Sequence, residues 1–243
     1  MLRMEIALFL VLAFVAYIYF SAEERQGLLH KTFAVLLATV LVHLVFDAIT
    51  IYTVNHLDTV PRMLNDMVHR IFMGTMNLVI FLFYRYIAIL VEEETGKSRR
   101  LDLVAEIFLV GAELGTFLLP IRYVATDIGN YSSGLYVVVC YVSVVFYLLL
   151  CAGLLLSNWK EMEQKKKSVI GAALLIEVTV CVLQGLHHEW LISGMGILNM
   201  SYDENKQAVL VAIADVGVNQ TVKIYMNLSC DLYGALLEII TAK

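Results

Sequence analysis

Long apolar runs that recur between short charged segments constrain this sequence more than any other feature. Five runs are 18 to 24 residues long, and a helix needs about 20 apolar residues to cross the hydrocarbon core of a bilayer. A sixth run, at the start of the chain, has 15 residues. We therefore predict a bundle of membrane-spanning helices. The runs are 6–20, 33–54, 71–91, 101–124, 135–156 and 169–186.

The composition excludes several alternatives. Of the 243 residues, 60% are hydrophobic and 16% are charged, whereas soluble domains have about 45–50% and about 25%. The net charge of -5 argues against a nucleic-acid partner, because phosphate binding needs a basic field. The four cysteines have no CxxC spacing, so we interpret them as small buried apolar residues and expect no cofactor.

Two segments leave alternatives open. The short run 6–20 is either a first span or the core of a signal peptide. Segment 190–200 is apolar but, with 11 residues, too short to cross a bilayer as a helix, so it is interfacial, re-entrant, packed against the other helices or a truncated span. The predicted fold class is an all-α, polytopic transmembrane bundle of six spans plus a partial seventh over residues 1–200. A short mixed α/β tail follows over 201–243, with a β-prone run at 207–214 and helical periodicity over 228–242.

Positive residues gather in alternate loops, and this predicts the orientation of the chain. The loops after the first, third and fifth runs contain nine Lys and Arg residues, and those after the second and fourth contain three. Positive loops lie in the cytoplasm, so we expect a multi-pass plasma-membrane protein with its N-terminus outside. The nine are Arg25, Lys31, Lys97, Arg99, Arg100, Lys160, Lys165, Lys166 and Lys167, and the three are Arg62, Arg70 and Arg122.

Polar residues inside the spans are the candidate functional residues, because ionisable groups at membrane depth are costly and rare. His43 and Asp47 are four residues apart and share a helix face. They are either a ligand or proton-relay site or a pair that only fixes helix packing.

Two further spans carry polar stripes. Glu106 and Glu113 share a face of the fourth span, and Asn77, Arg85 or His43 are the possible partners of Glu113. A structural hydrogen bond between helices is the alternative to a functional role. In the sixth span Glu177 and Gln184 form another stripe that leads to His187, His188 and Glu189. Convergence of the three stripes would create a polar ligand pocket or a pathway.

The His187-His188-Glu189 cluster has metal-ligand residue types, but adjacent histidines on a helix point about 100° apart, which makes a poor chelate. We therefore expect no metal site there. The chain shows no nucleophile and base constellation and no phosphate-binding glycine loop, so we expect a protein that is not an enzyme. No apolar run contains a lysine, which excludes retinal bound as a Schiff base.

Four segments together resemble the multi-span sensor region that precedes GGDEF diguanylate cyclase domains in bacterial signalling proteins. They are FSAEERQGLLHK (20–31), LVFDAITIYTVN (44–55), HRIFMGTMNLVIFLFYRYI (69–87) and LHHEWLISGMGI (186–197). The resemblance covers roughly residues 1–198 and implies a sensor that controls cyclic di-GMP synthesis. In that family a seventh span leads into the cyclase domain, but this chain contains no Gly-Gly-Asp-Glu-Phe sequence.

The tail resembles one internal piece of such a cyclase domain, through VAIADVG, VKIYMN and DLYGALLEII. That resemblance would make Asp215 a metal ligand and Asn227 a base-contacting residue. Because the spacing differs and the upstream entry motif is missing, the tail is expected to be a truncated or degenerate cyclase fragment without activity.

The sequence as a whole predicts a membrane sensory or receptor module that couples a ligand or the state of the membrane to a cytoplasmic output. Its expected partners are the lipid bilayer, a cytoplasmic signalling protein and further copies of itself in a homo-oligomer. The alternative is a small proton- or solute-coupled transporter that uses Asp47, Glu113 and Glu177 as its pathway.

Overall fold

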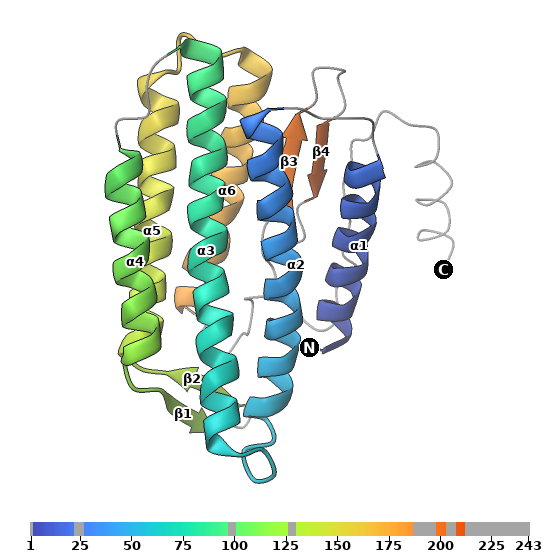
Figure 1. Cartoon of the computed structure of the whole chain (residues 1–243), viewed down its shortest axis with the longest axis vertical. Helices are drawn as coiled ribbons and strands as arrows, with labels where there is room; N and C mark the ends of the chain where they lie inside the picture. Colours follow the sequence, from blue (N-terminus) through green and yellow to red (C-terminus); the bar gives the residue numbers. More distant parts are fainter. Residues whose placement is uncertain are drawn as a thin grey trace.

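Six helices form the body of the molecule (Figure 1). The structure, a computed structural model, describes residues 2–21, 27–96, 101–125, 130–186, 198–202 and 208–211. Within these residues the helices are α1 (Leu2–Ser21), α2 (Leu28–Val54), α3 (Arg62–Thr95), α4 (Asp102–Leu118), α5 (Leu135–Ser157) and α6 (Gln164–Leu186). Four short strands are present as well: β1 (Arg122–Ala125), β2 (Asn130–Ser133), β3 (Leu198–Tyr202) and β4 (Ala208–Val211).

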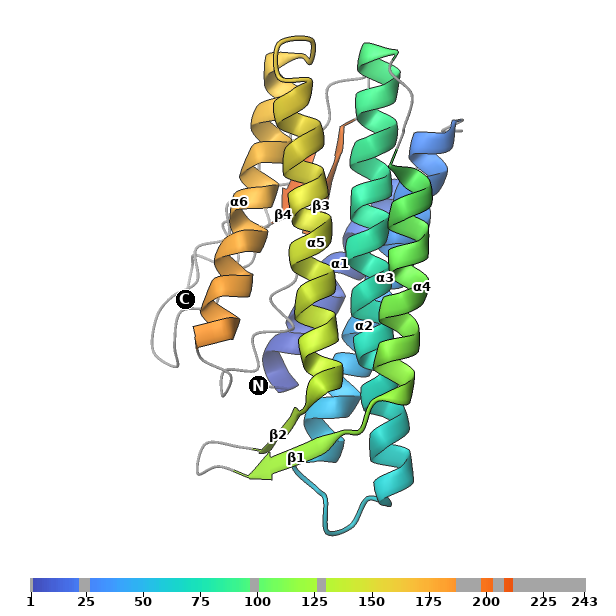
Figure 2. The same ribbon diagram turned by 90° about the vertical axis from the view of Figure 1, so that its left-hand side faces the viewer.

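Helix α3 is the centre of the bundle. It packs against α2, α4 and α5, while α1 packs on α2 and α6 packs on α5. Successive helices run in opposite directions, as Figures 1 and 2 show. The 34 residues of α3 extend over about 51 Å at 1.5 Å per residue. This exceeds the hydrocarbon thickness of about 30 Å, so α3 is longer than a helix needs to be to cross a bilayer.

Three of the described helices have the length and composition of membrane spans. Helices α2, α3 and α5 are long and apolar enough to cross a membrane. Large apolar side chains also cover the outside of the bundle: Leu103 on α4 and Leu149 on α5 are 68% and 67% exposed. A surface of this kind is unfavourable in water and suits lipid. The prediction of a mostly helical chain with membrane-length apolar helices is thus confirmed.

An aromatic cluster joins the three central helices. The ring of Tyr147 on α5 contacts Phe81 and Tyr84 on α3 and Phe108 on α4, with centroid distances of 5.8 to 5.9 Å. The Tyr147 hydroxyl, which is fully buried, donates a hydrogen bond to the backbone oxygen of Ala105 at 2.8 Å. A buried tyrosine needs such a partner, and here the bond links α5 to the first half of α4.

The fourth helix is shorter than the sequence predicts. The apolar run extends to residue 124, but α4 ends at Leu118 and Arg122 already belongs to β1. Proline at position 120 explains the difference, because it has no backbone N–H and disfavours the helical conformation of the residue before it. The apolar residues after Leu118 therefore enter a β-hairpin, which Figure 2 shows at one end of the bundle.

This hairpin was not predicted. Strands β1 and β2 are antiparallel, with Arg122 opposite Ser133. The side-chain amide of Asn130 donates a hydrogen bond to the Val54 backbone oxygen at 3.0 Å, which fixes the hairpin to the end of α2. Gly134 then starts α5 with φ at 131°, and a Cβ atom there would lie 2.9 Å from the backbone oxygen of Pro120. Only glycine suits this position.

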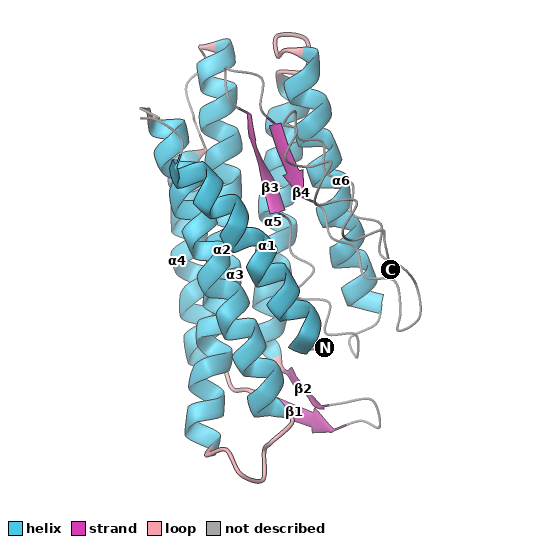
Figure 3. Ribbon diagram, turned by 90° about the vertical axis from the view of Figure 1, so that its right-hand side faces the viewer, coloured by secondary structure: helices cyan, strands magenta, loops and turns pink. Residues whose placement is uncertain are grey.

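The described part of the tail is a second pair of strands. Strand β3 pairs with β4 in antiparallel fashion, and β3 contacts α6 (Figure 3). Strand β4 falls within the β-prone run 207–214, and β3 crosses the predicted domain boundary at residue 200. Asp215, Asn227 and the segment 228–242 lie outside the described residues.

Candidate functional site

His43 connects α2 to α3 through a hydrogen bond whose direction can be deduced. Its Nδ1 atom lies 3.0 Å from the hydroxyl oxygen of Thr75, and Thr75 donates its one hydroxyl hydrogen to the backbone oxygen of Phe72 at 2.8 Å. Nδ1 must therefore be the donor, which makes Nε2 an acceptor in the neutral ring. Nε2 is buried and has no hydrogen-bond partner in the described structure.

Asp47 lies one turn from His43 on the same face of α2, as predicted, and only 1% of its surface is exposed. Thr50 donates a hydrogen bond to the Asp47 backbone oxygen at 2.7 Å. The ring of His43 stacks on Phe72 with a centroid distance of 4.8 Å. Both predicted residues are therefore at a helix interface and not at the lipid-facing surface.

Glu113 meets Asn77 where α4 crosses α3. The Asn77 amide nitrogen donates a hydrogen bond to the Thr116 hydroxyl at 3.1 Å and also bonds the Glu113 carboxyl group. One carboxyl oxygen of Glu113 lies so close to Gly74 that a Cβ atom there would be 2.8 Å from it. Of the three predicted partners of Glu113, Asn77 is the one the structure places beside it.

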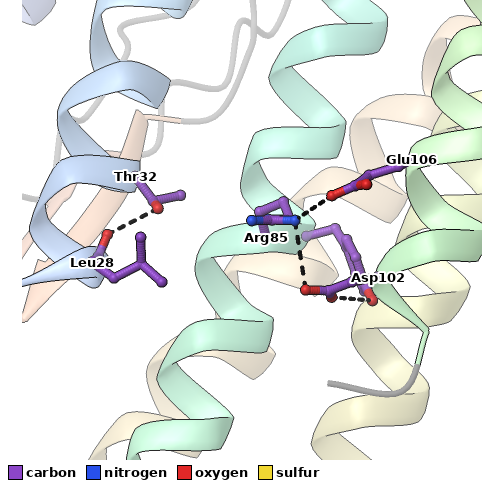
Figure 4. Close-up of polar contacts among 6 residues, drawn as sticks. Leu28, Thr32, Arg85, Asp102 and Glu106 are labelled. Carbon is purple, nitrogen blue, oxygen red and sulfur yellow. Dashed lines mark hydrogen bonds and ion pairs between the residues drawn. The ribbon is translucent and has the colours of Figure 1, made fainter. Parts of the chain in front are cut away.

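Glu106 and Arg85 form a separate ion pair nearer the other end of α4. The Arg85 guanidinium lies 2.7 Å from the Glu106 carboxylate and 3.5 Å from that of Asp102, as Figure 4 shows. Tyr84 also donates a hydrogen bond to Asp102 at 3.3 Å. Arg85 is thus engaged with two acids at this level and is not the partner of Glu113.

The third polar stripe belongs to α6, which packs on α5. Glu113 instead lies on α4 against Gly74 of α3, so Glu113 and Glu177 belong to different helix pairs. Gln184 belongs to α6, its side chain is not among those described, and His187, His188 and Glu189 lie outside the described residues.

The structure reveals polar groups at the hairpin end that the sequence did not single out. Tyr123 donates a hydrogen bond to the Asp66 carboxylate at 2.6 Å. Burial raises the pKa of Tyr123, and the hydrogen bond and negative charge of Asp66 raise it further. His69 stacks edge-on against Tyr123, and its Nδ1 is 2.9 Å from the backbone oxygen of Asn65. In the sequence, the spacing of Asn65 and His69, four residues apart on one helix face, was the signal that could have indicated this polar group.

Arg70 holds the end of α4. Its guanidinium donates hydrogen bonds to the backbone oxygens of Thr116 and Phe117 at 2.9 and 2.5 Å. These carbonyl groups belong to the last turn of α4 and have no intrahelical partner. Arg70 was predicted only as a topology signal, and the structure gives it this additional contact.

The opposite end of the bundle is held by lysines of the fifth loop and α6. Lys166 forms an ion pair with Glu94 at the end of α3, and Lys167 donates a hydrogen bond to the Trp159 backbone oxygen at 3.0 Å. Among the described side chains, no three His, Cys, Asp or Glu residues are grouped so that they could hold a metal ion.

Comparisons with protein-family models, curated proteins and solved structures give no match to this chain. The fold and the polar contacts between its helices are therefore the basis for a functional proposal.

Proposed function

We propose that this chain is a membrane-embedded sensory module that couples a ligand or the state of the bilayer to a cytoplasmic signalling output. The observation that carries the proposal is the position of the polar side chains. His43, Asp47 and Asn77 lie between apolar helices and are 0 to 4% exposed. The packing of helices around such polar groups depends on which ligand hydrogen-bonds to them and on whether they carry a charge.

The proposed orientation places the N-terminus outside and the fifth loop in the cytoplasm. The two ends of the bundle differ in charge: Lys160 and Lys165 to Lys167 lie at the α5–α6 turn, while Arg62, Arg70 and Arg122 lie at the end with the hairpin. The positive-inside rule assigns the lysine-rich end to the cytoplasm. Six spans and a partial seventh complete this topology, with the protein in the plasma membrane and assembled as a homo-oligomer.

The proposed output is of the cyclic di-GMP type and rests on the resemblance of residues 1–198 to GGDEF-associated sensor regions. A signal of this kind requires two helix packings that bind the ligand with different affinities. The contacts at His43 and Asn77 join α2, α3 and α4, so a change at either contact alters the packing of α3, which reaches the cytoplasmic end in this topology.

The test is copurification of the full chain with a cytoplasmic diguanylate cyclase, followed by measurement of cyclic di-GMP synthesis. We expect Asp47→Asn and Glu113→Gln to change this activity several-fold. The matched control is Glu93→Gln, which makes the same change of charge near the end of α3. An activity that is indifferent to both span variants would refute the sensor.

A transporter is the second candidate, because Asp47, Glu113 and Glu177 are acids inside or beside the helices. It predicts uptake of protons or solute by proteoliposomes that contain the purified chain, and a pure sensor predicts none. One argument against a continuous pathway is that Glu113 lies on α4 against α3, whereas Glu177 lies on α6, which packs on α5.

A further inference from the structure

Three polar side chains occupy one level of the interface between α3, α4 and α5. Asn77 and Ser143 have no exposed surface, and Glu113 is half-buried. The Asn77 amide is hydrogen-bonded to the Glu113 carboxyl group. Two of the buried atoms at this level, Asn77 Oδ1 and Ser143 Oγ, have no hydrogen-bond partner in the described part of the chain.

The packing of the helices places Ser143 at the level of the other two residues. Helices α3 and α5 run in the same direction (Figure 1), and Tyr147 contacts Phe81. Ser143 and Asn77 each lie one turn before these residues on the same helix faces, so they lie at the same level of the α3–α5 interface.

Contacts between α4 and α5 place Ser143 at the same level. Phe108 stacks on Phe146 of α5, and Gly115 lies against Val139, where a Cβ atom would be 3.1 Å from a Val139 methyl carbon. Because α4 and α5 are antiparallel, these two contacts place Ser143 at the level of residues 111 and 112 of α4. Glu113 follows directly, and it acts electrostatically on Cys140 and Tyr147, which lie one turn to either side of Ser143. The three polar side chains therefore lie at one level of the bundle and form one candidate site.

The site offers hydrogen-bond acceptors. Asn77 has two amide hydrogens, and its amide bonds Thr116 and Glu113, which leaves the Oδ1 acceptor of Asn77. The Glu113 carboxylate accepts hydrogen bonds only, and the Ser143 hydroxyl can accept as well as donate. A ligand that satisfies these atoms must therefore donate several hydrogen bonds.

The charge of the site is negative. Glu113 has no ion-pair partner among the described residues, and the nearby arginines are engaged elsewhere. Arg85 is held by Glu106 and Asp102, and Arg70 is held by the carbonyl groups at the end of α4. An uncompensated carboxylate between apolar helices is costly, so a bound cation would stabilise this arrangement.

We propose that Glu113, Asn77 and Ser143 bind a small cation that carries N–H donors, of the ammonium or primary ammonium class. Such a cation supplies both the positive charge and the hydrogen bonds. A calcium or magnesium ion takes about six or more oxygen ligands, more than these three side chains provide, and zinc favours nitrogen and sulfur ligands. This inference adds a ligand class to the proposed function. It rests on that function only in assuming that ligand binding produces a signal.

The first test measures the thermal unfolding of the purified full chain in detergent micelles, in chloride salts of ammonium, methylammonium, sodium and tetramethylammonium at equal concentration and neutral pH. We expect ammonium and methylammonium to raise Tm by several degrees in a saturable manner. Sodium and tetramethylammonium have no N–H donors and should leave Tm unchanged. Equal effects of the four salts would overturn the proposal.

Variants locate the site. Glu113→Gln and Asn77→Leu should abolish the ammonium-dependent rise in Tm, and Ser143→Ala should weaken ammonium binding several-fold. The matched control is Glu106→Gln, which makes the same change seven residues earlier on α4 and should retain the full ammonium-dependent rise. A rise that persists in Glu113→Gln contradicts the assignment.

A second measurement on the unmodified chain stays decisive if the variants do not fold. Dicyclohexylcarbodiimide modifies carboxyl groups in apolar surroundings, and mass spectrometry of peptides reports the adduct. We expect modification of Glu113 that ammonium prevents and tetramethylammonium does not. Modification that ammonium leaves unchanged overturns the proposal.

These outcomes are separate from those that test the sensor. Ammonium binding with no change in cyclic di-GMP synthesis would retain the site and refute the sensor. An output that responds to Asp47→Asn in a chain that ammonium does not stabilise would retain the sensor and refute this ligand class.

Discussion

Replacement of Arg70 by methionine tests how the end of α4 is held. Arg70 donates two hydrogen bonds to backbone oxygens of the last turn of α4, at 2.9 and 2.5 Å. Its positive charge also lies at a helix C-terminus, where cations are favourable. Methionine keeps an unbranched apolar stem and a similar helix propensity, so Arg70→Met removes the donors with little change in packing.

The expected cost follows from these contacts. A hydrogen bond to a charged group contributes about 1.5–3 kcal/mol, so two such bonds set an upper limit of about 3–6 kcal/mol. Arg70 is half-buried, and water can replace part of what is lost, so we expect a loss of about 2 kcal/mol in the free energy of unfolding.

Arg62→Met is the matched control on the same helix. The Arg62 side chain is 79% exposed, and its ion pair with Asp66 is 4.0 Å long. An exposed pair of this kind contributes about 0.3–0.5 kcal/mol. The difference between the two variants should therefore be about 1.5 kcal/mol, or about tenfold in the unfolding equilibrium constant.

The assay is reversible unfolding of the purified chain in mixed micelles with increasing sodium dodecyl sulfate, followed by far-ultraviolet circular dichroism. Hydrogen exchange of the hairpin amides supplies a local measurement, because release of the α4 end should increase exchange in 122–125 in Arg70→Met alone. Equal destabilisation by the two variants, with unchanged hairpin exchange, would refute the reasoning.

Two further predictions concern α3 and its neighbours. Gly74→Ala places a methyl group 2.8 Å from the Glu113 carboxyl oxygen, so that carboxyl group must turn away. Because it is the end of a flexible side chain and alanine is favoured over glycine in a helix by about 1 kcal/mol, we expect a change of less than about 1 kcal/mol in the same unfolding assay but a several-fold weaker response to ammonium. Gly111→Ala, which meets open space, is the control and should keep the full response. Tyr123→Phe removes the hydrogen bond to Asp66. Because the folded pKa of Tyr123 is raised, its contribution to stability is complete below about pH 10 and disappears as pH rises through the folded value. Unfolding measured at increasing pH should therefore show that the wild type is more stable than Tyr123→Phe and that this difference shrinks only in alkali.

The helices could be predicted from the sequence because length and hydrophobicity are properties of each run by itself. The run 135–156 and helix α5 (Leu135–Ser157) begin at the same residue and end one residue apart. The apolar run continues past Pro120 and so predicts a longer α4, but the proline ends the helix. The hairpin could not be predicted because its position depends on Asn130 reaching the end of α2.

The candidate site, too, could be predicted only in part from the sequence. Helical periodicity was sufficient to place His43 and Asp47 on one face and to identify Glu113 as a carboxyl group inside an apolar run. It could not identify Ser143, because a serine in an apolar run is common and its importance depends on which residues lie opposite.

The sequence alone determined where the long apolar helices lie and which polar residues lie within them. The tertiary structure decided the partners: Thr75 for His43, Asn77 for Glu113, and Glu106 with Asp102 for Arg85. The physical reason is the distance along the chain over which each effect acts. Hydrophobicity and helix periodicity act along the chain within a few turns, whereas a hydrogen bond across an interface depends on how two helices, far apart in sequence, are rotated and offset against each other.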